Sequence, residues 1–136
     1  MTGVQTCALP IYIGKITKPE YFTENEADRG SKHKKLSPSM STLIIIAHVK
    51  DGIELGELYG LPQQILDFIP QHHGTSCVEY FYMQALSESE ENVDAPELDR
   101  DSFRYPGPRP QSKETAVVML ADSIEARPAP HRGVVA

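Results

Sequence analysis

The first candidates for a metal site in this 136-residue sequence are the histidine pair His72-His73, a third histidine, His48, and an acid, Asp122. Imidazole and carboxylate groups bind first-row divalent metals. Adjacent residues project about 100° apart on a helix. We therefore expect His72 and His73 to serve two neighbouring duties rather than to chelate one ion together, which indicates a two-centre site.

Each of these residues also has a purely structural interpretation. The histidine pair precedes Gly74, and histidines before a helix-ending glycine can cap the last carbonyl groups of that helix. A single buried histidine such as His48 is commonly a hydrogen-bonded core or capping residue. Lys15 and Asp122 can be ordinary surface charges. From residue types and spacing alone, the two interpretations of the histidine pair are evenly balanced.

The element that must carry His48 is predicted to be a helix. Ser37-Pro38 places a capping hydroxyl before a proline, which is typical of a helix start. We expect this helix to run to about Asp51 and to be buried on most sides, because the residues before His48 are apolar without a break. Gly52 is then expected to separate it from a second, short helix.

The histidine pair is predicted to lie at the end of another helix. Leu61-Pro62 begins that helix, with proline in its first turn. Pro70 lies inside the pattern, and an interior proline removes a backbone hydrogen bond and clashes with the preceding turn. A kink just before His72 is the predicted consequence.

The last predicted helix carries Asp122 and begins at the capping residue Ser112. One stripe of this helix is apolar and consists of Ala116, Val117, Leu120 and Ile124. Asp122 lies on a different side, beside apolar residues, where an acid needs a partner. The preceding segment is rich in proline and aromatic residues, and it is predicted to be an ordered loop packed by Phe103 and Tyr105 or else a loop over the ligand site, with packing the favoured role.

Length and composition bound the class of protein. The length fits one domain, and 40% apolar with 24% charged residues suits a soluble globular chain. The formal charge of −6 argues against a duplex nucleic acid as partner, whereas a small phosphate ligand remains compatible. Cys7 and Cys77 show no metal-binding spacing and indicate no disulfide framework. We expect neither a membrane span nor a signal peptide within the chain.

Several strings, taken in order, resemble the HD-domain phosphohydrolases and, more narrowly, the cytoplasmic HD domain of bacterial seven-transmembrane HD receptors. The strings are IGKI (13–16), KLSPS (35–39), IIIAHVKDG (44–52), FI (68–69), QHHG (71–74), FRYPGP (103–108), QSKE (111–114) and LADSIEA (120–126). The similarity runs from about Tyr12 to Ala126.

The resemblance implies an all-α HD-domain helical bundle that is truncated at its N-terminus and lacks its first helices. It implies a metal-dependent phosphodiesterase that hydrolyses cyclic di-AMP to the linear dinucleotide with two divalent ions, Mn²⁺ or Fe²⁺. His48, His72 and His73 would then hold one ion and Asp122 the other, while Lys15 acts as a catalytic residue near the substrate phosphate. No further substrate-binding residue is implied.

The parent protein is then expected to be attached to the bacterial inner (plasma) membrane through a missing N-terminal region, with this domain in the cytoplasm. Two alternatives stay open. One is an HD hydrolase that acts on another nucleotide. The other is a degenerate HD module that binds a nucleotide or a protein partner without turnover.

The chain is expected to have three parts. Residues 1–11 read like a translated sequencing adapter and are interpreted as non-native, residues 12–126 as a partial HD domain, and residues 127–136 as a non-matching tail. The family has a His-Asp pair where this chain has Ile11 and Tyr12, and an adapter ending in T before the last two bases of an aspartate codon would encode Tyr12. This fragment is therefore expected to be impaired as an enzyme.

Overall fold

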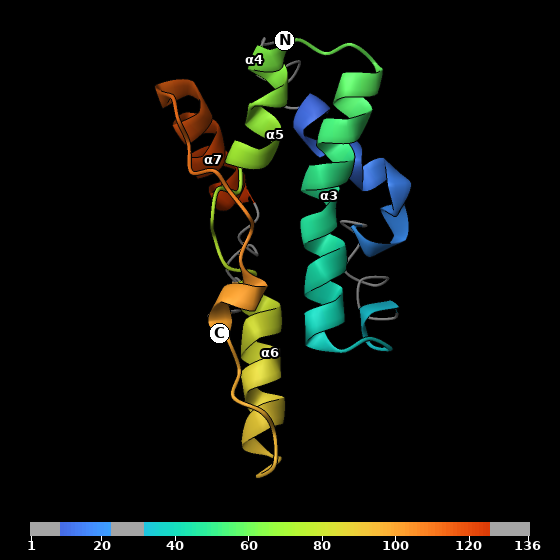
Figure 1. Cartoon of the computed structure of the whole chain (residues 1–136), viewed down its shortest axis with the longest axis vertical. Coiled ribbons are helices and arrows are strands. Elements are labelled where there is room, and N and C mark those ends of the chain that lie inside the picture. Colours follow the sequence, from blue (N-terminus) through green and yellow to red (C-terminus); the bar gives the residue numbers. More distant parts are fainter. Residues whose placement is uncertain (1–8, 23–31, 126–136) are drawn as a thin grey trace, which may run out of the picture.

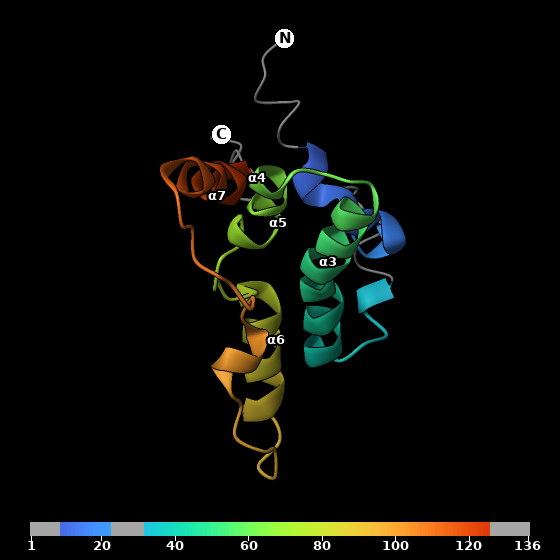
Figure 2. The same ribbon diagram turned by 45° about the horizontal axis from the view of Figure 1, so that its top comes forward.

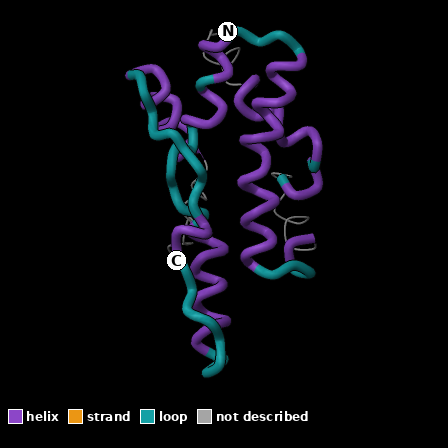
Figure 3. The backbone as a smooth tube through the Cα atoms, viewed as in Figure 1, coloured by secondary structure: helices purple, strands orange, loops and turns teal. Residues whose placement is uncertain are grey.

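The computed structural model describes residues 9–22 and 32–125, and the regular elements in these ranges are helical (Figure 1; Figure 3). The elements, with η denoting a 3-10 helix, are η1 (Leu9–Thr17), η2 (Pro19–Tyr21), α3 (Pro38–Leu58), α4 (Gln63–Leu66), α5 (Phe68–Gln71), α6 (Glu79–Glu90), η3 (Arg100–Phe103) and α7 (Lys113–Glu125). Within the described ranges, strand-like pairing is limited to an isolated bridge between Cys77 and Arg104. The predicted all-α fold class is confirmed.

Helix α3 is the longest element, and the other elements that build the site pack against it. η1 begins between α3 and the α4–α5 segment and then crosses to the far side of α3, while α5 and α6 lie on one side of α3 (Figure 1). The predicted start is confirmed, because the Ser37 side chain accepts a hydrogen bond from the Met40 amide at 3.3 Å and Pro38 is the first helical residue. The predicted end at about Asp51 is wrong, since α3 continues to Leu58.

Gly52 lies inside α3 because neighbouring segments approach the helix closely there. A Cβ atom at this position would lie 3.0 Å from the Ile69 Cγ2 atom and 3.4 Å from the Gly14 amide nitrogen. Glycine in a helix interior lowers helix stability by up to about 1 kcal/mol relative to alanine, and close packing of this kind offsets that loss. The glycine therefore marks a contact of α3 with α5 and η1, and the helix does not end at it.

Proline 70 falls within the first turn of α5, where its missing amide hydrogen removes no intrahelical hydrogen bond. The helical pattern is interrupted at Asp67, between α4 and α5. This break frees the Leu66 carbonyl, with which the proline ring would clash in a continuous helix. The kink was predicted just before His72, whereas the interruption lies at Asp67, upstream of Pro70, and α5 leads into His72, whose amide donates to the Phe68 carbonyl at 3.0 Å.

The hydrophobic core lies between these helices in two clusters. The first consists of Val49, Leu66, Ile69 and Tyr105, and the second of Phe81, Ala85 and Phe103. Phe103 and Tyr105 are both buried, so the prediction of an ordered loop packed by these two rings is confirmed. Ile11, in the segment interpreted as adapter-like, is only 1% exposed in η1.

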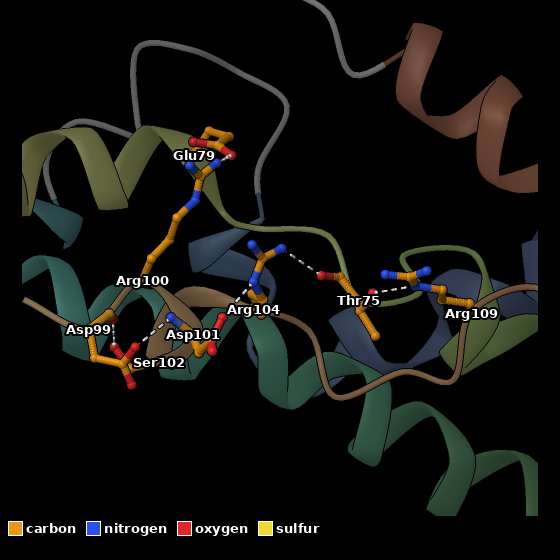
Figure 4. A network of polar contacts seen from close by, with 8 residues as sticks. All are labelled: Thr75, Glu79, Asp99, Arg100, Asp101, Ser102, Arg104 and Arg109. Carbon is orange, nitrogen blue, oxygen red and sulfur yellow. Dashed lines mark hydrogen bonds and ion pairs between the residues drawn. The ribbon is translucent and has the colours of Figure 1, made fainter.

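Charged side chains fix the loop between η3 and α7 to the turn that follows the histidine pair (Figure 4). Arg104 donates to the Thr75 carbonyl at 3.3 Å, and Arg109 donates to the Thr75 hydroxyl at 3.3 Å. Arg100 forms an ion pair with Glu79 at the start of α6. Exposed pairs of this type contribute little stability individually. Together, the contacts of Arg104 and Arg109 with Thr75 connect the loop to the turn.

Helix α7 lies beside α4 and α5 (Figure 2). Its predicted cap is confirmed, because the Ser112 hydroxyl accepts a hydrogen bond from the Thr115 amide at 3.1 Å. The predicted stripe faces largely away from the core, since Val117, Leu120 and Ile124 are exposed. The side that carries Asp122 packs inward instead. Among the described helices, none combines the length and apolar character needed to cross a bilayer.

Candidate metal centre

Three of the five predicted site residues converge at one point of the fold. His48 lies on α3, His72 ends α5, and His73 follows it in the turn that closes at Gly74, which has a positive φ of 54°. One ligand atom from each histidine lies within 4.8 Å of the corresponding atoms of the other two. The structure therefore brings together residues that are far apart in the sequence.

The expectation that His72 and His73 cannot face one ion together does not hold. The centroids of their rings are 3.9 Å apart, and both rings contribute to the same group of ligand atoms. The expectation assumed regular helical directions for both side chains, whereas His73 lies beyond the last residue of α5. A turn allows neighbouring side chains to converge in a way that an ideal helix does not.

The local hydrogen bonds of the histidines indicate which ring nitrogens are available to a metal. His48 Nδ1 faces the Ile45 carbonyl, and His72 Nδ1 faces the Ile69 carbonyl. A ring nitrogen must carry a proton to donate to a carbonyl, so the other nitrogen, Nε2, keeps its lone pair. Both Nε2 atoms are buried and have no hydrogen-bond partner among the described residues. Buried acceptors of this kind need a donor or a cation, and the site therefore fits a metal ion.

The electrostatic surroundings keep the three imidazoles neutral. Burial lowers the pKa of His48 from 6.5 to about 4, and burial together with the neighbouring His72 and His48 rings lowers that of His73 to about 2. Burial also lowers the pKa of His72, although the Asp122 carboxylate opposes this shift. Neutral imidazole is the form that binds a metal, so at pH 7 the group is ready to accept a divalent ion.

Asp122 lies beside the three histidines, with its side chain 13% exposed. Its Oδ2 atom is 3.6 Å from His73 Nδ1, and its Oδ1 atom accepts a hydrogen bond from the Tyr12 hydroxyl. The sequence predicted that this acid needs a partner, and these two groups are its partners. Tyr12 also places its ring edge-on to His72, at a centroid distance of 5.8 Å.

Lys15 is placed close to the site by η1. Its ammonium lies 4.5 Å from the centroid of the Tyr12 ring and 5.5 Å from that of Phe22. Its positive charge contributes to lowering the pKa of all three histidines. Gly14 allows this placement, because a Cβ atom there would lie 1.8 Å from the His48 carbonyl oxygen.

Two residues that support the site were not identified as site residues from the sequence. The Tyr105 ring stacks on His73 with a centroid distance of 4.1 Å and an interplanar angle of 12°. Burial raises the pKa of Tyr105, which therefore stays protonated. Gln71 is buried, and its side-chain oxygen accepts a hydrogen bond from the Gln111 amide at 2.9 Å. The sequence signal that could have identified Gln71 is its position directly before His72. Tyr105 was predicted only as a packing residue.

A shallow depression of about 500 Å³ lies elsewhere, on α6, and is lined by Glu79, Tyr80, Met83 and Gln84. None of the three clustered histidines lines it. The histidine group and this depression therefore lie at different places in the structure.

Among the curated relatives that are similar to the chain in sequence, two are named cyclic-di-AMP phosphodiesterase PgpH. The Bacillus subtilis protein is 42% identical over 114 residues, which are 84% of this chain and 15% of that protein. The Listeria monocytogenes protein is 44% identical over 114 residues, with the same two shares. The chain thus spans 15% of the length of these relatives. No family model matches the chain.

Two solved structures are similar to the chain in fold. One is the crystal structure of the HD domain of the L. monocytogenes phosphodiesterase PgpH, with a TM-score of 0.76 and 34% identity over 93% of this chain and 58% of that one. The other is the same domain in complex with cyclic-di-AMP, with a TM-score of 0.76 and 36% identity over 93% of this chain and 57% of that one. Similarity in sequence and in fold therefore leads to the same proteins.

Proposed function

We propose that this chain, which belongs to the HD-domain phosphohydrolases and has the fold of the PgpH HD domain, is part of a phosphodiesterase that hydrolyses cyclic di-AMP to the linear dinucleotide. The relatives named for this activity and the solved complex with cyclic-di-AMP support this substrate. The observation that carries the proposal is the group of three histidines, of which His48 and His72 are buried and His73 is half-buried, with the lone pairs of two Nε2 atoms left without a partner in the described structure.

The proposed cofactors are two divalent ions, Mn²⁺ or Fe²⁺. His48, His72 and His73 would hold one of them, and Asp122 contributes the adjacent carboxylate. Imidazole and carboxylate ligands together suit these metals. Bound ions would supply Lewis acidity toward the phosphodiester and lower the pKa of a water molecule, so that no side chain has to act as the nucleophile.

The residues around the histidines orient the reacting groups and balance charge. Lys15 is the catalytic residue in this proposal: its ammonium, which lies next to the Tyr12 ring, would offset negative charge that develops on the phosphate. Tyr105 stacks on His73 and limits rotation of that ring. The Tyr12 and Tyr105 rings lie against the histidines and keep bulk water away from their buried faces. Exclusion of water strengthens electrostatic interactions with the substrate.

We also propose that the native gene encodes His-Asp in place of Ile11 and Tyr12, and that this chain is consequently impaired. The adapter-like sequence of residues 1–11 supports this proposal. Independent long reads across the locus would test it. A continuous reading frame that retains Tyr12 would refute the artefact and favour a degenerate HD module, the second candidate function.

The domain is further proposed to be the cytoplasmic part of a longer protein of the bacterial inner membrane. The chain spans only 15% of the length of its PgpH relatives, which supports a longer parent protein, and the sequence resemblance to the seven-transmembrane HD receptors supports the membrane attachment. Fractionation of cells that express the complete gene would test this, with recovery of the full-length protein in the soluble fraction as the opposing result.

A cleavage assay tests the activity itself. The domain is purified with the upstream region and His-Asp restored, loaded with Mn²⁺ or Fe²⁺, and supplied with cyclic di-AMP or, as a control substrate, another cyclic dinucleotide. We expect the linear dinucleotide to form from cyclic di-AMP, and His72→Ala to lose metal and activity together. Turnover confined to the control substrate would support a different HD hydrolase. Cleavage by His72→Ala with normal metal content would refute the proposed site.

A further inference from the structure

The segment between η3 and α7 runs alongside the turn that carries the histidine pair. Near the start of this segment, the Tyr105 amide donates to the Ser76 carbonyl at 2.9 Å. Near its end, the Gln111 amide donates to the side-chain oxygen of the buried Gln71 at 2.9 Å. One hydrogen bond thus lies after the histidine pair in the sequence and the other before it. The residues between Tyr105 and Gln111 are therefore held against the histidine turn.

Arg109 lies in this part of the segment and touches the turn with its backbone and its side chain. A Cβ atom on Gly74, the residue that follows the histidine pair, would lie 3.6 Å from the Arg109 Cα atom. The Arg109 Nε atom donates to the Thr75 hydroxyl at 3.3 Å (Figure 4). These contacts keep the Arg109 side chain at the turn that presents His73 to the metal site.

Arg109 differs from the other arginines that the structure describes in the way its charge is balanced. Arg100 pairs with Glu79, and Arg104 pairs with Asp101 at 2.8 Å (Figure 4). Among the described residues, no carboxylate pairs with Arg109, and its two terminal nitrogens have no hydrogen-bond partner. Since this side chain is exposed, both nitrogens are open to a ligand. The planar guanidinium group is suited to donate two parallel hydrogen bonds to a phosphate.

The proposed substrate contains a group that needs such a cation. A cyclic dinucleotide has two phosphodiesters, each with one negative charge, and hydrolysis cleaves one of them at a time. In the proposed function, the phosphodiester that is cleaved meets the metal site and Lys15, so the other one needs a separate partner. The chain is acidic, with a formal charge of −6, and its overall field repels an anionic ligand unless local cations offset the repulsion. Arg109 is a cation beside the histidine turn that no acid neutralises in the described structure.

From these contacts we propose that Arg109 binds the phosphodiester that is not being cleaved, and that it thereby favours substrates with two phosphates. The proposal rests on the proposed function for the class of substrate and adds a specificity-determining residue to it. The charge of this second phosphodiester does not change during the reaction, so Arg109 holds it equally well before and during cleavage. Loss of Arg109 is then expected to raise KM and to leave kcat nearly unchanged.

The test uses the complete parent protein loaded with Mn²⁺ and compares two substrates. Cyclic di-AMP has two phosphodiesters, whereas bis(p-nitrophenyl) phosphate has one. We expect Arg109→Gln to raise KM for cyclic di-AMP by about 10–100-fold, which corresponds to the loss of a hydrogen bond between charged groups, and to leave cleavage of bis(p-nitrophenyl) phosphate unchanged. Arg104→Gln is the matched control, because Arg104 also donates to Thr75 but is neutralised by Asp101. We expect it to change KM for neither substrate.

Three results would overturn the role of Arg109. They are an unchanged KM for cyclic di-AMP in Arg109→Gln, equal losses on the two substrates, and equal effects of Arg109→Gln and Arg104→Gln; the last two would show that Arg109 only holds the turn. Calorimetric titration of the Mn²⁺-loaded protein with cyclic di-AMP makes the same comparison without turnover, and we expect a Kd about 10–100-fold higher in Arg109→Gln. Cleavage confined to another cyclic dinucleotide would refute the proposed function alone. The same variants would then test Arg109 with that substrate, since it also has two phosphodiesters.

Discussion

Replacing Gly14 with alanine is expected to separate η1 from α3 and to move Lys15 away from the histidines. The new Cβ atom would lie 1.8 Å from the His48 carbonyl oxygen and 2.6 Å from the Gly52 amide nitrogen. Both are backbone atoms of a helix and cannot rotate away. Reaching ordinary van der Waals contact requires η1 to shift by about 1.5 Å. Overpacking of this severity lies at the upper end of the usual range, about 3 kcal/mol.

The facing residue provides a matched control. Alanine at Gly52 places its Cβ atom 3.0 Å from Ile69 Cγ2, the end of a side chain that can adjust by a few tenths of an ångström. The gain in helix propensity, up to about 1 kcal/mol, opposes this contact. Gly52→Ala is therefore expected to change the free energy of unfolding by less than about 1 kcal/mol.

Urea unfolding followed by circular dichroism measures both effects. We expect a lower midpoint for Gly14→Ala with an unchanged m-value, and a midpoint near that of the parent chain for Gly52→Ala. In the restored domain, Gly14→Ala should cleave more slowly, because η1 carries both Lys15 and the restored His-Asp pair, whereas the three histidines belong to α3 and the turn after α5 and should keep their own ion. Misplacement by about 1 Å can lower a rate about 100-fold. Equal stability of the two variants would refute the close packing of η1 on α3.

Three further expectations follow from burial and charge. Because the pKa of His48 is lowered to about 4, the unfolded chain binds more protons than the folded chain between pH 4 and pH 6.5, so the free energy of unfolding should fall on acidification through this window. Urea titrations at pH 6.5 and pH 5 should differ by about 1.6 kcal/mol from His48 alone. Phe103→Ala should lower the free energy of unfolding by about 3–5 kcal/mol, whereas the exposed Val117→Ala should change it by less than about 0.5 kcal/mol. Lys15→Met should leave metal affinity equal or higher, since it removes a nearby positive charge, but lower cleavage by about 10²–10³-fold; reduced metal content would instead indicate a structural role.

Local signals in the sequence predicted the helix starts well. Ser37 and Ser112 cap helices because a hydroxyl next to the first free amides satisfies a requirement that arises within one turn. The role of Gly52 could not be predicted in the same way. Whether a glycine ends a helix or admits a neighbour depends on residues far away in the sequence, in this case Gly14 and Ile69.

For the candidate site, the identities of the residues could be predicted from the sequence, but the directions of their side chains could not. Residue types and order indicated His48, His72 and His73, because imidazole chemistry does not depend on the fold. The direction of each ring does depend on it, and the convergence of His72 with His73 arises in a turn whose geometry the helical pattern does not contain. The apolar stripe of α7 was recognisable as a face, but periodicity does not reveal what covers a face.

Position 12 links the chemistry of the site to the question of what this chain can do. A phenol donates one proton and satisfies Asp122, whereas a carboxylate at the same place would be a second negative group beside Asp122. Two adjacent carboxylates repel unless a cation lies between them, so the aspartate that we propose for the native gene would create an electrostatic demand for a second ion, whereas Tyr12 forms a hydrogen bond. The three histidines are unaffected by that exchange, since the acceptors for His48 and His72 are main-chain carbonyls. We therefore expect this chain to keep its histidine group beside a carboxylate that is hydrogen-bonded to Tyr12, and to have little hydrolytic activity until the His-Asp pair is restored.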